Sequence, residues 1–121
     1  MTEVSTLTAV ISTLVAAEML FIFYLETFAT TSRQTARVFG MEQEELRQPS
    51  VQSLFRNQGI YNAAIGIMLL LALYVWVSPV TVIFLLCNVV GVAAYGGLSV
   101  SPSIFFKQGT LAVLALLSML I

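Results

Sequence analysis

Histidine is absent from this 121-residue chain, and cysteine occurs once, at Cys87. Without histidine there is no imidazole for a metal site or for the base of a catalytic triad, and a single cysteine excludes an internal disulfide. Charge is scarce as well, because charged residues make up 9% of the chain and residues 57–106 contain none. No run of basic residues indicates a nucleic-acid partner. The sequence therefore predicts no metal, no cofactor and no nucleic acid.

Apolar residues make up 59% of the chain, whereas a soluble domain is nearer half apolar. About 20 apolar residues cross a bilayer as a helix, so the uncharged residues 57–106 are long enough for two spans with a turn. The chain begins Met-Thr-Glu with no basic region, and its first apolar stretch exceeds a signal-peptide core, which predicts a retained first span. We expect an all-α integral membrane protein, a four-helix bundle with the lipid bilayer as its surroundings, forming a single transmembrane domain over residues 1–121.

Four spans are expected, at roughly residues 7–28, 57–77, 80–98 and 104–121, with a polar connector at 29–56. Proline marks the breaks that precede the third and fourth spans, since it disfavours helix continuation. All five basic residues, including Lys107 at the start of the fourth span, fall on the connector's side of this arrangement. The positive-inside rule then places the connector in the cytoplasm and both termini outside a multi-pass cell-membrane protein.

The connector is expected to be partly helical. Thr31 or Ser32 is suited to cap a short helix, Gly40 to end it, and Pro49 to begin a helix that leads into the second span. The side chains expected to face the membrane surface are those of Val38, Phe39 and Met41. An interfacial amphipathic connector is the first interpretation, and a gate or partner-binding element is the alternative.

Glu18 lies near the midpoint of the first span, among apolar neighbours. A charged side chain at that depth costs about 2.5–3.5 kcal/mol on insertion scales. Glu18 must therefore be neutral, face a wet cavity or find a partner on another helix. Asn88, near the middle of the third span, is the expected partner because an amide can pair with either form of a carboxyl. A functional proton site and a structural contact between helices are both open interpretations.

A second carboxyl, Glu26, follows on the same helix. It lies ~12 Å further along the axis and about 80° around it, so the two carboxyls cannot form a close acid–base pair. Glu26 is expected close to the cytoplasmic interface. A functional role there competes with snorkelling, or with pairing to Arg33 or Arg56.

Polar side chains gather at the cytoplasmic end of the second span. Asn57 and Tyr61 share one helical face, and Gln58 and Asn62 share the next. The polar vestibule expected at this depth consists of Glu26, Asn57, Gln58, Tyr61, Asn62 and Gln108. The alternative is that these groups satisfy helix ends and form interhelical hydrogen bonds, worth about 0.6 kcal/mol each.

Small residues in the second and third spans predict close helix packing. They are Ala63, Ala64 and Gly66, and then Gly91, Ala93, Ala94, Gly96 and Gly97. The last of these also leave Tyr95 room to turn toward the vestibule, so Tyr95 joins the candidate site.

The segments Glu18–Phe28, Asn57-Gln58-Gly59-Ile60-Tyr61-Asn62, Ala94-Tyr95-Gly96 and Gln108 resemble the small bacterial four-span proteins catalogued as domain of unknown function 1304. The resemblance covers nearly the whole chain, and the Asn-Gln-Gly-x-Tyr-Asn element is its most specific part. It implies four spans and a site built from Glu18, Glu26 and the amide cluster, but no established activity. Many members carry histidine directly after the first glutamate, where this chain has Met19, and this departure bears on any mechanism that relies on that histidine.

Three functions follow as hypotheses. A transporter of a small cationic or amphipathic molecule is favoured, because a membrane-embedded carboxyl such as Glu18 can exchange a proton for a cation. The small multidrug resistance proteins provide an architectural analogy for this role, and the little volume inside four spans would then require a homo-oligomer. The second hypothesis is a membrane enzyme that acts on a lipophilic substrate. Glu26 would be its acid or base, Tyr61 its proton donor and Arg56 its anion-binding group. A non-catalytic protein that binds lipid or a partner is the third.

Overall fold

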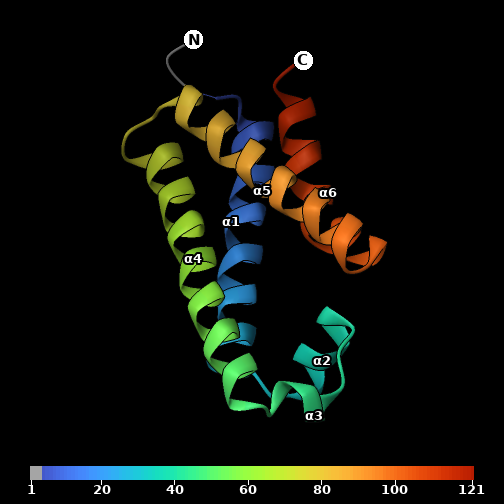
Figure 1. The fold of residues 1–121 in the computed structure, drawn as a ribbon. Coiled ribbons are helices and arrows are strands. Elements are labelled where there is room, and N and C mark those ends of the chain that lie inside the picture. The colour runs from blue at the N-terminus through green and yellow to red at the C-terminus, as the bar shows by residue number, and fades with distance from the viewer. Residues whose placement is uncertain (1–3) are drawn as a thin grey trace.

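The computed structural model describes residues 4–121, and within them the chain forms six α-helices and no strand. The helices are α1 (Thr6–Thr27), α2 (Arg33–Phe39), α3 (Gln43–Leu46), α4 (Pro49–Tyr74), α5 (Pro79–Ser99) and α6 (Pro102–Ser118). Helices α1 and α4 lie side by side as one antiparallel pair, while α5 and α6 form a second pair that packs against them (Figure 1). The expected all-α bundle of four long helices is confirmed.

Local signals set the helix ends as predicted. The side chain of Ser32 accepts a hydrogen bond of 3.1 Å from the Thr35 backbone N–H and so caps α2. Gly40 ends α2 in a left-handed conformation with a φ of 64°. Pro49 begins α4, which therefore starts well before the expected span at residue 57 and carries the connector directly into the bundle.

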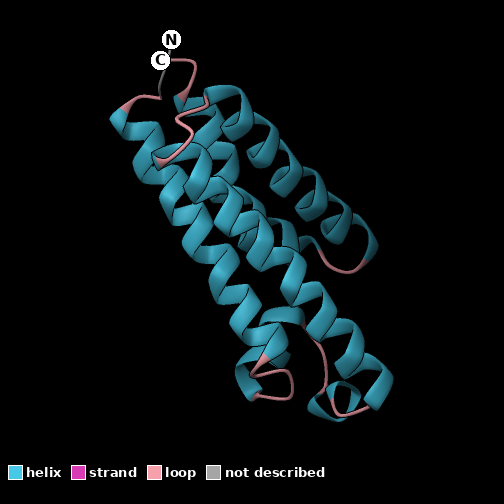
Figure 2. Ribbon diagram, turned by 90° about the vertical axis from the view of Figure 1, so that its left-hand side faces the viewer, coloured by secondary structure: helices cyan, strands magenta, loops and turns pink. Residues whose placement is uncertain are grey.

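Three helices, α1, α4 and α5, are long and apolar enough to cross a membrane. Helix α6 is also apolar but has 17 residues, in line with the short final segment that the sequence predicted. The start of α1 and the end of α6 lie at one end of the bundle, and α2 and α3 lie at the other (Figures 1 and 2). The number of spans stays a prediction.

The core lies where α1 meets α4 and α6. Its buried members include Val15, Ala16, Met19, Ile22, Leu69, Ala72, Leu73, Leu86, Ala112 and Ala115. Glycine allows α4 to approach α1 closely: a Cβ at Gly66 would lie 3.1 Å from the Ala16 carbonyl oxygen, and one at Gly59 would overlap the Thr27 hydroxyl. The backbones of α1 and α4 are therefore in contact along much of their length.

The small-residue prediction is right in part. Ala63 and Gly66 are buried against α1, and added Cβ atoms at Gly96 and Gly97 would press on α6. The prediction is wrong for Ala64, which is exposed, and for Gly91, because nothing lies within 4 Å of the position its Cβ would take. In both cases the helix turns its small residue away from its neighbours.

Helices α4 and α5 are joined by a short turn at residues 75–78. Val77 in this turn has a φ of 48°, the single positive φ among the non-glycine residues that the structure describes. From the turn, α5 runs away from α4 at an angle (Figure 1). This divergence leaves space between the two helices, and the polar side chains collect there.

Candidate functional site

Polar side chains from three helices meet in a cleft between α4 and α5. The cleft has a volume of about 340 Å³ and is open to the surface of the bundle. It is lined by Gln58, Tyr61, Asn62, Ala64, Ile65, Met68, Asn88, Val92 and Gln108, and we call it the amide cleft. Four of these side chains are polar residues that the sequence analysis assigned to a vestibule. Asn88 joins them from α5.

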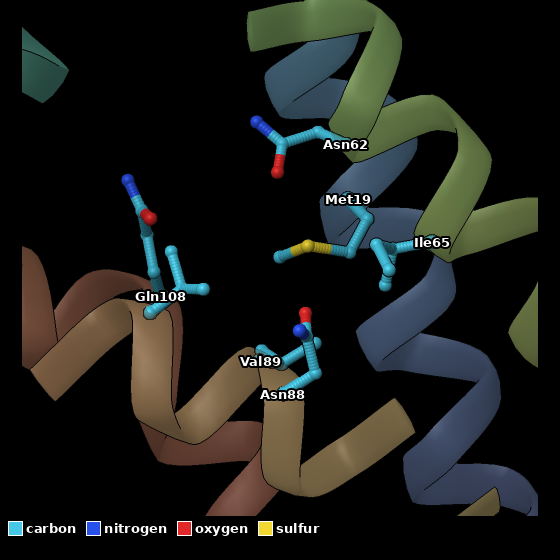
Figure 3. Close-up of a pocket in the computed structure, with 7 residues that line it drawn as sticks. Met19, Asn62, Ile65, Asn88, Val89 and Gln108 are labelled. Carbon is cyan, nitrogen blue, oxygen red and sulfur yellow. The ribbon is translucent and has the colours of Figure 1, made fainter. Parts of the chain in front are cut away.

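The amide cleft has a narrow inner end of about 30 Å³, which is room for about one water molecule. Met19 of α1 and Val89 of α5 close it. Figure 3 shows the side chains of Asn62, Asn88 and Gln108 around the tip of Met19, each coming from a different helix. Three amide groups therefore surround one small space, and together they offer both hydrogen-bond donors and acceptors.

Glu26 lies directly behind Asn62. Its side chain is fully buried, at 0% exposure, and Oε1 accepts a 2.5 Å hydrogen bond from Asn62 Nδ2. Oε2 is buried as well and has no hydrogen-bond partner among the described residues. The absence of a side chain at Gly59 lets α4 come close here, because an added Cβ would lie 3.2 Å from Glu26 Cβ. A carboxyl group is thus held one hydrogen bond away from the amide cleft.

One of the two alternatives for Glu26 is wrong, while its expected place beside Asn62 agrees with the structure. That alternative had Glu26 snorkelling or paired with Arg33 or Arg56, whereas its side chain is buried and bonded to Asn62. Arg56 instead donates a 3.1 Å hydrogen bond to Gln52 Oε1, one turn earlier on α4. The reason is helical phase, since Gly59 and Asn62 face α1 while Arg56 is exposed.

Glu18 stands apart from this cluster. It is partly buried on α1, its Oε1 has no hydrogen-bond partner among the described residues, and it does not line the amide cleft. The expected pairing with Asn88 is not formed, because Asn88 is exposed and turns into the cleft. The structure therefore brings Glu26, Asn62, Asn88 and Gln108 together, and leaves Glu18 on its own.

The remaining candidates lie at the edges. Tyr61 and Gln58 are exposed on the rim of the amide cleft, whereas Asn57 is exposed and lines neither this cleft nor its neighbour. Tyr95 is exposed and lines a second cavity below. Among residues 4–121, no three cysteine, aspartate, glutamate or histidine side chains gather in a way that could hold a metal ion.

This second cavity, which we call the connector compartment, has a volume of about 400 Å³. Its lining residues are Phe39, Met41, Phe55, Gln58, Val92, Tyr95, Gly96, Ser99, Val100, Ile104 and Gln108. The prediction that Phe39 faces the membrane surface was wrong: its side chain is 8% exposed and packs edge-on against Phe55, with ring centroids 5.2 Å apart. Sequence reasoning missed this compartment because it forms only when α2 folds back onto the bundle.

Two side chains hold α2 in that position. The Thr35 hydroxyl donates to the Ala29 carbonyl oxygen at 2.6 Å. The Lys107 ammonium group donates to the carbonyl oxygens of Val38 at 3.1 Å and Arg37 at 3.4 Å. Lys107 thus binds the C-terminal end of α2, where carbonyl groups lack helical partners and favour a cation.

Comparison with known proteins agrees with the resemblance seen in the sequence. The family described as Protein of unknown function (DUF1304) matches residues 13–120. The chain belongs to this family. An uncharacterized protein, YpaA, of Lactococcus lactis subsp. lactis (strain IL1403) is 49% identical over 113 residues, which cover 93% of this chain and 95% of that protein. No solved structure matches the chain significantly.

Family membership gives one of the lining residues added interest. Met19, the position where the resemblance in the sequence implied histidine in many members, closes the inner end of the amide cleft. The thioether of methionine is a weak acceptor and an adaptable apolar group. The strong hydrogen-bonding side chains that line this end of the cleft are therefore the three amides, with Glu26 bonded behind Asn62.

Proposed function

We propose that this DUF1304 protein is an integral cell-membrane protein with four spans, and that it transports a small cationic or amphipathic molecule. The connector is cytoplasmic and both termini are outside in this proposal. Three long apolar helices support a membrane location, as do the large apolar side chains on their outer faces, such as Phe84 and Leu98. The basic residues of the connector, together with Lys107 against α2, support the orientation.

The observation that carries the proposal is the amide cleft with Glu26 behind it. The side chains that line the cleft include no basic residue, while amide groups and a phenol supply hydrogen-bond acceptors. Glu26 Oε2 is buried without a partner in the described part of the chain, so a negative charge on this carboxyl lacks compensation until a cation arrives. Such a site favours a ligand that is positively charged and carries N–H donors.

Two carboxyl groups then have different roles in the proposal. Glu26 balances the charge of the ligand through Asn62, which lies between the carboxyl and the cleft. Glu18 is the second membrane-embedded carboxyl and remains the proposed proton-exchange site, since an ionisable residue within a span is a functional candidate. Because a single copy leaves the cleft open on its side, a homo-oligomer is part of the proposal as the form that encloses the path.

A lipid-binding or partner-binding role without transport is the second candidate. It is favoured by the way the amide cleft opens on an apolar surface, where exposed Met68 and Val92 form part of the rim. The enzyme hypothesis has less support from the geometry. Arg56, its expected anion-binding group, is exposed and bonded to Gln52, away from Glu26 and Tyr61.

The test is a flux measurement in proteoliposomes. A gradient of n-octylguanidinium is imposed, and an enclosed pH-sensitive dye reports proton counterflow. A guanidinium head is suitable because it stays charged at every accessible pH and offers several N–H donors. We expect proton counterflow with the wild type, none with Glu26→Gln, and none with Glu18→Gln. Glu42→Gln, a change to an exposed connector carboxyl, is the matched control and should retain wild-type flux.

Binding separates the candidates when flux alone does not. In the same preparation, a hydrophobic carbodiimide that attacks protonated carboxyls is followed by mass spectrometry at Glu18 and Glu26. If the protein transports n-octylguanidinium, this probe should protect at least one of the two carboxyls from the carbodiimide. The glutamine variant of the protected carboxyl should then lose flux. Binding without flux in the wild type would support the lipid-binding or partner-binding role. If the wild type shows no binding and no flux, both candidate functions are contradicted.

A further inference from the structure

The amide cleft and the connector compartment adjoin one another and share three lining side chains. Gln58 of α4, Val92 of α5 and Gln108 of α6 line both parts. The volumes are similar, about 340 Å³ above and about 400 Å³ below. A molecule that occupies both parts would therefore pass the two glutamines.

The two parts differ in chemistry. The upper part has the amides of Asn62 and Asn88, with the Glu26 carboxyl one hydrogen bond behind. The lower part is walled mainly by apolar and aromatic groups, among them Phe39 and Phe55 in edge-on contact. A cavity that is polar at one end and apolar at the other matches a ligand with the same division.

Hydrogen bonds hold α2 in place as part of the wall of the connector compartment. Thr35 anchors α2 to the carbonyl oxygens of Leu25 at 3.2 Å and Ala29 at 2.6 Å, and Lys107 binds the other end of α2. Phe39 is consequently held against Phe55 on α4. The connector, which sequence reasoning interpreted as an interfacial element, thus contributes side chains to the cavity.

We infer that the amide cleft and the connector compartment act as one cavity and bind a single-chain amphipathic cation. Its N–H-bearing head lies among the amides near Glu26, and its apolar chain lies in the connector compartment. This inference rests on the proposed function and deepens it by naming the ligand class. The positive charge of the ligand is inferred from the lining. No basic side chain is among the described residues that line either part, and Lys107, next to Gln108 in the sequence, is bound to α2 carbonyl oxygens.

A pair of tryptophan variants tests where the chain lies. Ser99 lines the connector compartment, so Ser99→Trp fills it. Leu98 is the neighbouring residue on α5, is 89% exposed and lines neither part of the cavity, so Leu98→Trp is the matched control. The probes are guanidinium, which has only a head, and n-octylguanidinium, which has head and chain. Dissociation constants are measured by saturation-transfer NMR in phosphatidylcholine nanodiscs, with empty nanodiscs correcting for partition into lipid.

The wild type should bind n-octylguanidinium at least roughly tenfold more tightly than guanidinium, because the chain gains packing in the compartment. Ser99→Trp should remove this advantage while leaving guanidinium binding unchanged, and Leu98→Trp should behave as wild type. If Ser99→Trp and the wild type bind n-octylguanidinium equally, the chain lies in the bilayer and the inference is overturned, while the proposed function stands. If neither probe binds the wild type, the proposed function fails as well.

A final arm separates a free amphiphile from a membrane lipid. Phosphatidylethanolamine also carries an ammonium head, so it is added to the nanodiscs as a competitor. We expect no displacement of n-octylguanidinium, because the phosphate of that lipid would bring a negative charge close to Glu26. Displacement would assign the cavity to a lipid headgroup and overturn the single-chain ligand.

Discussion

The Glu26 carboxyl is the least compensated polar group near the cleft. It has no exposed surface, and within residues 4–121 only one of its two oxygens has a hydrogen-bond partner. Leaving a buried polar group unpaired costs about 1–3 kcal/mol, and more for a charged one. The single hydrogen bond from Asn62 should therefore contribute more to stability than an ordinary hydrogen bond. Because Asn62 also lines the amide cleft, this bond links the stability of the α1–α4 pair to whatever binds in the cleft.

Replacing Asn62 with alanine should thus destabilise the fold. We expect Asn62→Ala to lower the free energy of unfolding by about 1–3 kcal/mol, since Glu26 would lose its partner. The measurement is unfolding in mixed detergent micelles followed by circular dichroism. Asn57→Ala removes an exposed amide from the same helix and should change stability by less than about 0.5 kcal/mol.

A double variant checks the cause. If the loss comes from an orphaned carboxyl, Glu26→Leu combined with Asn62→Ala should be less destabilised than the sum of the two single changes. Equal losses for Asn57→Ala and Asn62→Ala would show that the bond to Glu26 contributes nothing.

At the scale of helices, glycine controls how closely two elements approach. Gly59 sits where α4 crosses the end of α1, under Glu26, whereas Gly91 on α5 faces open space. The same residue type therefore has opposite roles on two helices. Gly59→Ala and Gly91→Ala are therefore a matched pair: each adds one methyl group to a helix, but only the first adds it at a close contact.

Gly59→Ala should push α4 away from α1, because the new methyl group would overlap the Thr27 hydroxyl and lie 3.2 Å from the Phe23 carbonyl oxygen. We expect a loss of about 1–3 kcal/mol, typical of overpacking. Gly91→Ala has no steric cost and raises helix propensity, so it should be neutral or stabilise by up to about 1 kcal/mol. Thermal unfolding of both variants in detergent decides the matter, and a destabilised Gly91→Ala would reveal a contact on that face.

Helix ends were predictable from sequence, while helix faces were only partly so. Ser32, Gly40 and Pro49 act within a few residues of themselves, and their roles were foreseen. The exposed face of Gly91 and the Glu26–Asn62 bond were not foreseen. A helix that is apolar all round has no polar face to mark its outer side, so the sequence does not show which residues meet another helix. Depth in the membrane was the only guide to the amide cleft. It brought Gln58, Tyr61, Asn62 and Gln108 together, but it also predicted a pairing of Asn88 with Glu18 that the structure does not form.

At the scale of the whole molecule, the fold has two distinct ends. The start of α1 and the end of α6 share one, and the connector occupies the other. This arrangement is what four spans require, since an even number of crossings returns the chain to its starting side. A labelling experiment can therefore test span number and orientation together.

The experiment uses single cysteines in a Cys87→Ser background and a membrane-impermeant maleimide on intact cells. Val4→Cys and Leu120→Cys should be labelled at once, and Glu44→Cys, in the exposed connector, only after the cells are permeabilised. Labelling of Leu120→Cys together with Glu44→Cys would mean that α6 does not cross and that three spans are correct. A full reversal would keep four spans and invert the orientation.

The turn between α4 and α5 has a mechanical consequence. Val77 is a β-branched residue held at a φ of 48°, a conformation that costs of order 1–3 kcal/mol and that other torsions would relieve. Asn88 lies about 14 Å along α5 from the first residue of that helix. With the turn as pivot and α5 as a lever, a tilt of about 10° would move Asn88 by about 2 Å, close to the difference between a direct hydrogen bond and a broken one. The turn at Val77 is therefore the point about which a tilt of α5 would change the width of the amide cleft.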